Sequence, residues 1–64
     1  MDPIVSSRKK IVLIEDEDVL AGILKEKLEG EGYEVGTAKD GVEGVDLIRS
    51  LKPHMVLLDM MLPR

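Results

Sequence analysis

The chain has 64 residues, so it can form at most one small domain, and a domain of this size buries only about 60% of its unfolded surface. Hydrophobic residues make up 44% of the sequence and charged residues 34%, and the net charge of −4 argues against nucleic acid, which is bound through Lys and Arg. There is no cysteine, which excludes disulfides and Cys-based zinc sites, and no apolar run approaches a membrane span or a signal peptide, so we expect a cytoplasmic protein.

The first eight residues show no clear periodicity, and we expect residues 1–8 to be an N-terminal tail. The run "KKIVLIE", from Lys9 to Glu15, is then apolar without a polar interruption until its end. Unbroken apolar runs of this length are typical of strands that are covered on both faces, as in parallel sheets.

The stretch "EDEDVLAGILKEKLEGEG" changes to the period of a helix. We expect Asp16 or Asp18 to cap this helix, and Gly30 and Gly32 to end it. Its apolar residues fall on one helical face and should form the buried side: Val19, Leu20, Ile23, Leu24 and Leu28.

The second half of the chain repeats the alternation. "YEVGTA" reads as a short strand, and "DGVEGVDLIRSLK" as a helix capped by Asp40 and ended by Pro53. "HMVLLD" reads as another buried strand, with Met55 in the core. The apolar stripe of the second helix consists of Val42, Val45, Ile48 and Leu51. An order of strand, helix, strand, helix, strand predicts an α/β fold with parallel strands and right-handed crossovers.

Acidic residues follow two of the predicted strands. Glu15 and Asp16 end the first strand and Asp59 ends the third. If these strands are neighbours, the three carboxylates meet at one edge of the sheet, where α/β proteins bind ligands. Clustered carboxylates repel one another unless a cation lies between them, and hard oxygen ligands suit Mg²⁺. A carboxylate beside Mg²⁺ can also act as a nucleophile that forms an aspartyl phosphate.

A simpler interpretation exists for each acidic group taken alone. Acidic residues at the start of a helix commonly serve as caps, and an Asp after a strand is often a turn residue. Acids at the ends of two buried strands within one βαβαβ order favour a shared site over these separate explanations.

The segment from Lys9 to Arg64 resembles the receiver domain of bacterial two-component response regulators. Three stretches carry the likeness: "KKIVLIEDED", "LEGEGYEVGTAKDGVEGVDLI" and "KPHMVLLDMMLP". The resemblance implies a flavodoxin-like fold with its three parallel strands in the order 2-1-3. It also implies a partner, a sensor histidine kinase that donates a phosphoryl group, and a Mg²⁺ cofactor.

The resemblance assigns roles to four positions. Asp59 matches the phosphoacceptor, Asp16 matches a direct Mg²⁺ ligand, and Glu15 matches an acid that holds the ion through water. Met61, two residues beyond the acceptor, matches the position whose backbone carbonyl binds the metal, so its side chain is free to vary.

Two positions depart from the family pattern. His54 stands where receivers often carry Asp, at the opposite end of the strand from Asp59, so we expect no catalytic role for it. Gly44 stands where alanine is usual, which should weaken the second helix by up to about 1 kcal/mol.

A whole receiver has five strands and five helices, so we expect residues 9–64 to be a truncated receiver, a half-domain with three strands and two helices. Its third strand should then be an unpaired edge, and long apolar edges recruit other strands. We therefore expect self-association as a symmetric homodimer. We also expect slow or undetectable phosphorylation from small acyl phosphates, because the resemblance places the lysine that contacts the phosphoryl group in the second half of a whole receiver.

Two other functions remain open. The chain can be a self-associating structural half-domain without phosphotransfer activity. It can also be a Mg²⁺-dependent phosphohydrolase with an aspartate nucleophile, although the Asp16-x-Asp18 pattern after the first strand fits that class poorly.

Overall fold

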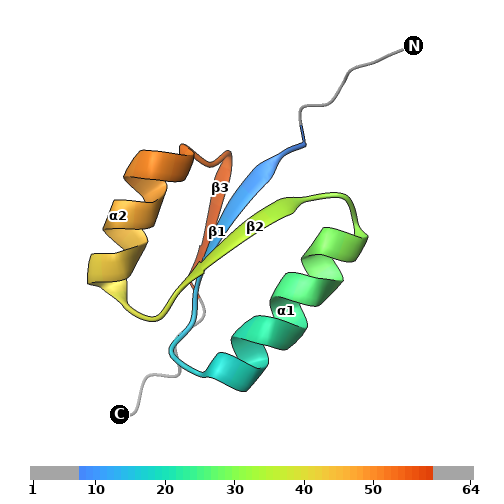
Figure 1. The fold of residues 1–64 in the computed structure, drawn as a ribbon, viewed down its shortest axis with the longest axis horizontal. Helices are drawn as coiled ribbons and strands as arrows, with labels where there is room; N and C mark the ends of the chain where they lie inside the picture. The colour runs from blue at the N-terminus through green and yellow to red at the C-terminus, as the bar shows by residue number, and fades with distance from the viewer. Residues whose placement is uncertain (1–7, 59–64) are drawn as a thin grey trace.

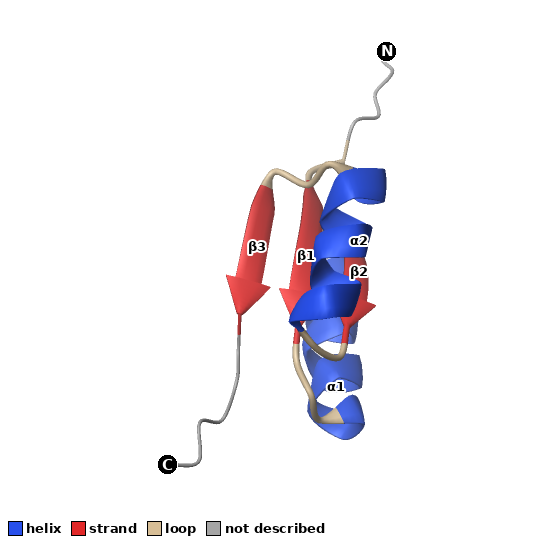
Figure 2. Cartoon of the chain, turned by 90° about the vertical axis from the view of Figure 1, so that its left-hand side faces the viewer, coloured by secondary structure: helices blue, strands red, loops and turns tan. Residues whose placement is uncertain are grey.

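The computed structural model describes residues 8–58, in which strands and helices alternate. The elements are β1 (Lys10–Ile14), α1 (Asp18–Gly30), β2 (Glu34–Ala38), α2 (Gly41–Leu51) and β3 (Met55–Leu58) (Figure 1). The three strands form one sheet in the order β2-β1-β3, and both pairings are parallel. Figure 2 shows all three arrows pointing the same way. The predicted α/β fold and its strand order are confirmed.

The core lies on both faces of the central strand β1. Successive side chains of a strand point to opposite faces, and each helix covers one face, so every residue from Ile11 to Ile14 is buried. The cluster under α1 contains Ile11, Leu13, Ala21 and Val35, and the cluster under α2 contains Val12, Ile14 and Ala38. The uninterrupted apolar run of β1 therefore reflects burial from two sides.

The predicted apolar stripes of the two helices are only partly buried. Val19 and Ile23 of α1 are 75% and 56% exposed, and Val42 and Val45 of α2 are 76% and 49% exposed, so these members of the two stripes lie outside the core. The helical residues that pack against the clusters are Leu24, Leu28, Leu47, Ile48 and Leu51. Each helix packs against β1 and β2. The exposed residues of each apolar stripe lie outside this packed surface. Neither helix in the described span is long and apolar enough to cross a membrane.

The starts of the two helices differ. Asp40 caps α2 as predicted, because its side chain accepts a hydrogen bond of 2.9 Å from the Glu43 N–H. The prediction that Asp16 or Asp18 caps α1 was wrong, since the N-cap is Glu17 and makes no side-chain cap bond. Asp18 lies inside the first turn, where its negative charge interacts favourably with the positive end of the helix dipole.

The ends of the helices follow the glycine and proline signals. Gly30 is the last residue of α1, and Gly32 takes a positive φ of 99° in the turn that follows. In α2 the last residue is Leu51, and its C-cap Lys52 adopts a left-handed conformation with φ 52°. Pro53 comes directly after this cap, as expected for a residue that cannot continue a helix.

The third strand is an edge of the sheet within residues 8–58, because β3 pairs with β1 alone. The prediction that it is buried was wrong, since Met55, Val56 and Leu58 are 51%, 42% and 65% exposed. Only Leu57 packs against a core cluster, the one under α1. The expected apolar edge is therefore present, and the expected place of Met55 in the core is not.

Candidate functional site

The carboxyl ends of the three strands lie at one edge of the sheet (Figure 2). In the parallel register, Ile14 at the end of β1 lies between Ala38 of β2 and Leu58 of β3. The backbone N–H of Glu15 donates a hydrogen bond of 2.9 Å to the carbonyl of Ala38, which extends the ladder by one residue. The acidic pair that follows β1 therefore begins at a fixed point of the sheet.

The two acids of this pair have different surroundings. Glu15 is 1% exposed, and its Oε2 accepts a hydrogen bond of 3.0 Å from the Glu17 N–H. Because an ionised carboxylate is costly to bury without hydrogen bonds or a counter-charge, this bond stabilises Glu15 at its site. Asp16 is exposed to solvent. One carboxylate is thus held by the loop, and its neighbour is open to a ligand.

Other acidic groups at this edge stabilise the start of α2. Glu43 accepts a hydrogen bond of 3.0 Å through Oε1 from the Lys39 N–H, and Asp40 accepts from the Glu43 N–H. The Asp40 side chain satisfies an N–H group that the helix start leaves without a partner in the helix, and the Glu43 side chain binds the N–H of the residue before the cap. We therefore do not count Asp40 and Glu43 as candidate ligands.

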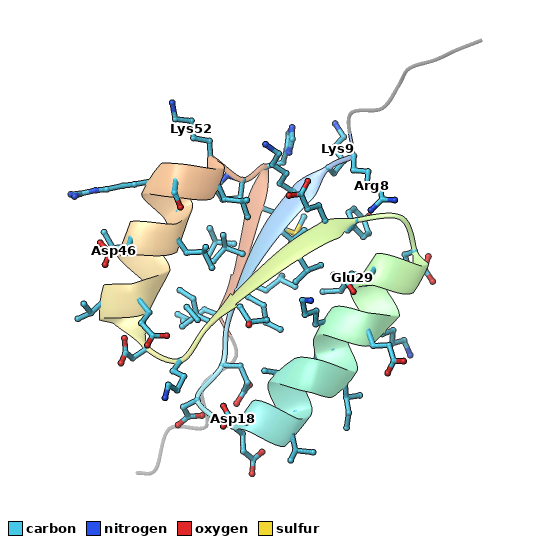
Figure 3. The ribbon with its side chains drawn as sticks, in the orientation of Figure 1. Arg8, Lys9, Asp18, Glu29, Asp46 and Lys52 are labelled. Atoms are coloured by element: carbon cyan, nitrogen blue, oxygen red, sulfur yellow. The ribbon has the colours of Figure 1, made fainter. Side chains whose placement is uncertain are left out.

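The opposite edge of the sheet carries basic residues. In Figure 3 Lys9 and Lys52 lie at that end, and Asp18 lies at the end with the acidic pair. His54 precedes β3 there and is exposed; its Nδ1 accepts a hydrogen bond of 3.0 Å from the Lys10 N–H. The His54 N–H in turn donates to the carbonyl of Lys10 at 2.8 Å. The predicted place of His54 is confirmed, and its side chain joins β1 to the start of β3.

The described residues supply part of the predicted metal set. Glu15 and Asp16 provide carboxylate oxygens, which are the ligands that Mg²⁺ prefers. Asp59 and Met61, the other two predicted ligands, lie outside the described residues. Between residues 8 and 58, no three His, Asp or Glu side chains gather closely enough to hold a metal ion. The described donors therefore fit Mg²⁺ in kind, as one exposed and one buried carboxylate at the end of β1.

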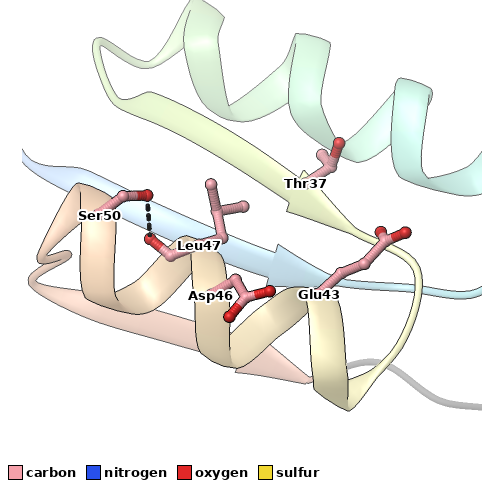
Figure 4. A pocket seen from close by; sticks show the side chains of 5 residues that line it. All are labelled: Thr37, Glu43, Asp46, Leu47 and Ser50. Carbon is pink, nitrogen blue, oxygen red and sulfur yellow. Dashed lines mark hydrogen bonds between the residues drawn. The ribbon is translucent and has the colours of Figure 1, made fainter.

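Two surface hollows lie away from the acidic pair. One of 290 Å³ is open and lies between β2 and α2, lined by Thr37, Glu43, Asp46, Leu47 and Ser50 (Figure 4). The Ser50 hydroxyl donates to the carbonyl of Leu47 at 3.3 Å, so its proton is used within the helix. The other, of 260 Å³, lies at the basic edge beside Tyr33 and His54. Neither hollow includes Glu15 or Asp16 in its lining.

The packing role of Gly44 was not predicted from the sequence. Gly44 is buried in α2, and a Cβ built on it would lie 2.5 Å from Cδ1 of Ile14. A glycine inside a predicted helix indicates close packing as well as low helix propensity. For Gly44, only the low helix propensity was taken into account.

One comparison with known proteins bears on these observations. A family model, the response regulator receiver domain, matches residues 11–64, which is 54 of the 64 residues. The matched span starts in β1 and includes the acidic pair, Asp59 and Met61. The predicted resemblance, which began at Lys9, is confirmed.

Proposed function

The chain belongs to the response regulator receiver domain family, and from that premise we propose that Asp59 accepts a phosphoryl group from a sensor histidine kinase, with Mg²⁺ bound beside it. The single observation that best supports this is the pairing of β1 with β3. Leu58, which precedes Asp59 in the sequence, lies opposite Ile14, which precedes Glu15, in a parallel register.

The proposed reaction is a transfer between two residues. A carboxylate oxygen of Asp59 attacks the phosphorus of a phosphohistidine on the kinase, the P–N bond breaks, and the imidazole leaves with the electron pair. An acyl phosphate remains on Asp59. The rigid part of the site is the end of β1, because β1 is buried on both faces and paired on both edges. A rigid element holds ligands for such a transfer more accurately than a loop does.

The acidic pair is the proposed metal site. Asp16, which is exposed, would bind Mg²⁺ directly, and the buried Glu15 would hold the ion through water while its Oε2 keeps the bond to the Glu17 N–H. Asp59 and the backbone carbonyl of Met61 would complete the protein ligands. When bound, Mg²⁺ neutralises charge on the phosphoryl oxygens.

The proposal includes the organisation of the chain and its setting. Residues 1–8 are a tail and residues 9–64 the receiver segment, an arrangement supported by a family match that starts at Ile11. The proposed setting is the cytoplasm, with the kinase as the partner and without direct contact to nucleic acid.

Labelling with acetyl phosphate tests the acceptor. The 64-residue chain is incubated with acetyl phosphate and Mg²⁺, and intact mass is followed over time beside an Asp59→Asn variant. Slow, Mg²⁺-dependent gain of one phosphoryl group on Asp59, or no detectable gain, is expected. Equal labelling of the variant contradicts the assignment of Asp59, and fast stoichiometric labelling contradicts the expected slow rate. Turnover of p-nitrophenyl phosphate would favour a phosphohydrolase instead.

A second candidate function is self-association without phosphotransfer. It is favoured by the apolar edge strand, in which Met55, Val56 and Leu58 are largely exposed. Edges of this kind pair with other strands, and a symmetric homodimer through β3 is the proposed form. Light scattering over a concentration series checks it: a mass that stays monomeric at high concentration excludes this function, and a dimer without labelling at Asp59 supports it.

A further inference from the structure

The contact between α2 and β1 depends on a glycine, Gly44, which has no side chain. Gly44 lies on the buried face of α2, and the side chain of Ile14 occupies the space where a Cβ would be: Cδ1 lies 2.5 Å and Cγ1 3.0 Å from that position. Real Cβ atoms essentially never come within 3.0 Å of another heavy atom. Any side chain at position 44 therefore requires either Ile14 or the helix to move.

We propose that Gly44 is a positioning residue for the acidic pair: it lets α2 rest directly on Ile14, and this contact fixes the end of β1 from which Glu15 and Asp16 extend. The effect on metal binding rests on the function proposed above, whereas the effect on the end of β1 does not.

Ile14 has little freedom to yield. It is 7% exposed and lies in the cluster with Val12 and Ala38, against Leu47 and Ile48. Rotation about the Cβ–Cγ1 bond can move Cδ1, but Cγ1, 3.0 Å from the added Cβ, is placed by the first side-chain torsion, which the branched Cβ makes stiff. The displacement caused by a side chain at position 44 therefore passes to the backbone of Ile14.

The helix is equally constrained at this point. The Gly44 N–H donates to the carbonyl of Asp40 at 2.9 Å, and the Asp40 side chain caps the same turn. On the other side, the Glu15 N–H is bonded to Ala38 at 2.9 Å. Since the helix start is held by its cap, strain at the contact is relieved at the end of β1, where displacement of Ile14 and Glu15 weakens the Glu15 N–H bond to Ala38.

The proposal predicts that Gly44→Ala destabilises the chain, whereas helix propensity alone predicts that it stabilises it. Alanine is favoured over glycine inside a helix, so Gly22→Ala in α1, where nothing lies within 4 Å of an added Cβ, should raise the folding equilibrium constant about fivefold. Gly44→Ala should lower this constant despite the same gain in propensity. Urea unfolding followed by circular dichroism measures both variants.

The contact between Gly44 and Ile14 is tested by removing one carbon from Ile14 and adding one carbon at Gly44. Ile14→Val removes Cδ1, and Gly44→Ala adds a carbon 2.5 Å from the position of Cδ1, so the double variant conserves core volume. In the Ile14→Val background, Gly44→Ala should raise the folding constant, which reverses its sign relative to the parent chain. An increase from Gly44→Ala in both backgrounds overturns the proposal, because Ile14 then moves aside freely. If Gly44→Ala alone does not fold, folding of the double variant still shows the reversal.

Positioning is measured separately from stability. Hydrogen exchange at the Glu15 amide, compared with the Leu13 amide in the same strand, should accelerate in Gly44→Ala and return to the parent rate in the double variant. Titration with Mg²⁺, read from the Glu15 and Asp16 amide signals, should show about tenfold weaker affinity in Gly44→Ala and normal affinity in the double variant and in Gly22→Ala. Unchanged exchange and affinity in Gly44→Ala overturn the positioning role.

The two proposals can fail independently. If the parent chain shows no response to Mg²⁺, the function proposed above loses its metal site, but the sign reversal and the Glu15 exchange rate still decide the role of Gly44. If the parent chain binds Mg²⁺ and Gly44→Ala binds it equally well, the role of Gly44 fails and the metal site stands.

Discussion

β1 and β3 are neighbouring strands with similar apolar sequences and opposite surroundings. In β1 the residues from Ile11 to Ile14 are at most 7% exposed, whereas in β3 Met55, Val56 and Leu58 are at least 42% exposed. β1 has a strand on each side and a helix on each face, and β3 has β1 alone as its strand partner in the described span. Composition therefore decides that a segment becomes a strand, and its neighbours decide how far it is buried.

The difference matters for the proposed site. The acidic pair Glu15 and Asp16 follows the strand that is fixed on all sides, while Asp59 follows in sequence the strand that is paired on one edge. Variants that weaken β1 should therefore remove the fold, and variants of β3 should change its attachment or its exposed surface with smaller effects.

The largest expected effect comes from the core of β1. Leu13→Ala removes a side chain that is 1% exposed and should cost about 3 kcal/mol of unfolding free energy, enough to unfold a domain of this size. Leu58→Ala is the matched change in β3, at 65% exposure, and should cost less than about 1 kcal/mol. Urea unfolding compares the two; equal costs would mean that β3 is as buried as β1.

The attachment of β3 to β1 should have an intermediate effect. His54→Ala removes the acceptor for the Lys10 N–H, a bond of 3.0 Å, and should cost about 1 kcal/mol. His54→Asn is the control, because an amide oxygen can accept the same bond. The Lys10 amide should exchange faster in His54→Ala and remain protected in His54→Asn. Loss of protection in both variants would show that the imidazole acts through packing instead.

The turn that leads into β3 offers a gain in stability. Lys52 is the one non-glycine residue between residues 8 and 58 with a positive φ, and glycine adopts that conformation without steric cost. Lys52→Gly should therefore stabilise the chain by about 0.5–1 kcal/mol. Lys39→Gly, the same change at a lysine whose φ is not positive, should not. The prediction fails if both variants shift the urea midpoint in the same direction.

The smallest effect on stability is expected on the outer face of β3. Val56→Lys places a charge on the exposed edge and should change the unfolding free energy by less than about 0.5 kcal/mol, while it lowers any self-association through that edge. Light scattering and urea unfolding on the same samples separate the two effects. Self-association that persists unchanged in Val56→Lys would place the contact elsewhere.

The order of the elements followed from local patterns in the sequence. The apolar run before Glu15, the glycines after α1 and the Asp40 cap each depend on residues close in the chain, and all appear in the structure. The order of the strands came from the family resemblance instead. The exposure of Val19, Ile23 and Val42 could not be read in this way, because it depends on which part of an apolar stripe meets the sheet. The exposure of Met55 depends instead on the place of β3 at the side of the sheet.

The sequence predicted which residues form the candidate site but not their surroundings. The position of the acids after β1 was clear from the sequence, but the pattern "ED" cannot tell which acid is buried. The structure distinguishes them, since Glu15 bonds the Glu17 N–H and Asp16 faces solvent. The close approach at Gly44 also escaped prediction, because it depends on the distance between α2 and Ile14. The metal-binding roles of Glu15 and Asp16 and the roles of Asp59 and Met61 stay predictions.

The most direct test of the central claim, that one edge of the sheet holds a Mg²⁺-assisted phosphoacceptor site, is a Mg²⁺ titration of the isotope-labelled chain by two-dimensional NMR, with Asp59→Asn as the comparison. The account predicts that the amide signals of Glu15, Asp16 and Asp59 shift together, and that Asp59→Asn weakens the affinity about tenfold. Shifts confined to other residues, or equal affinity in both chains, would contradict it.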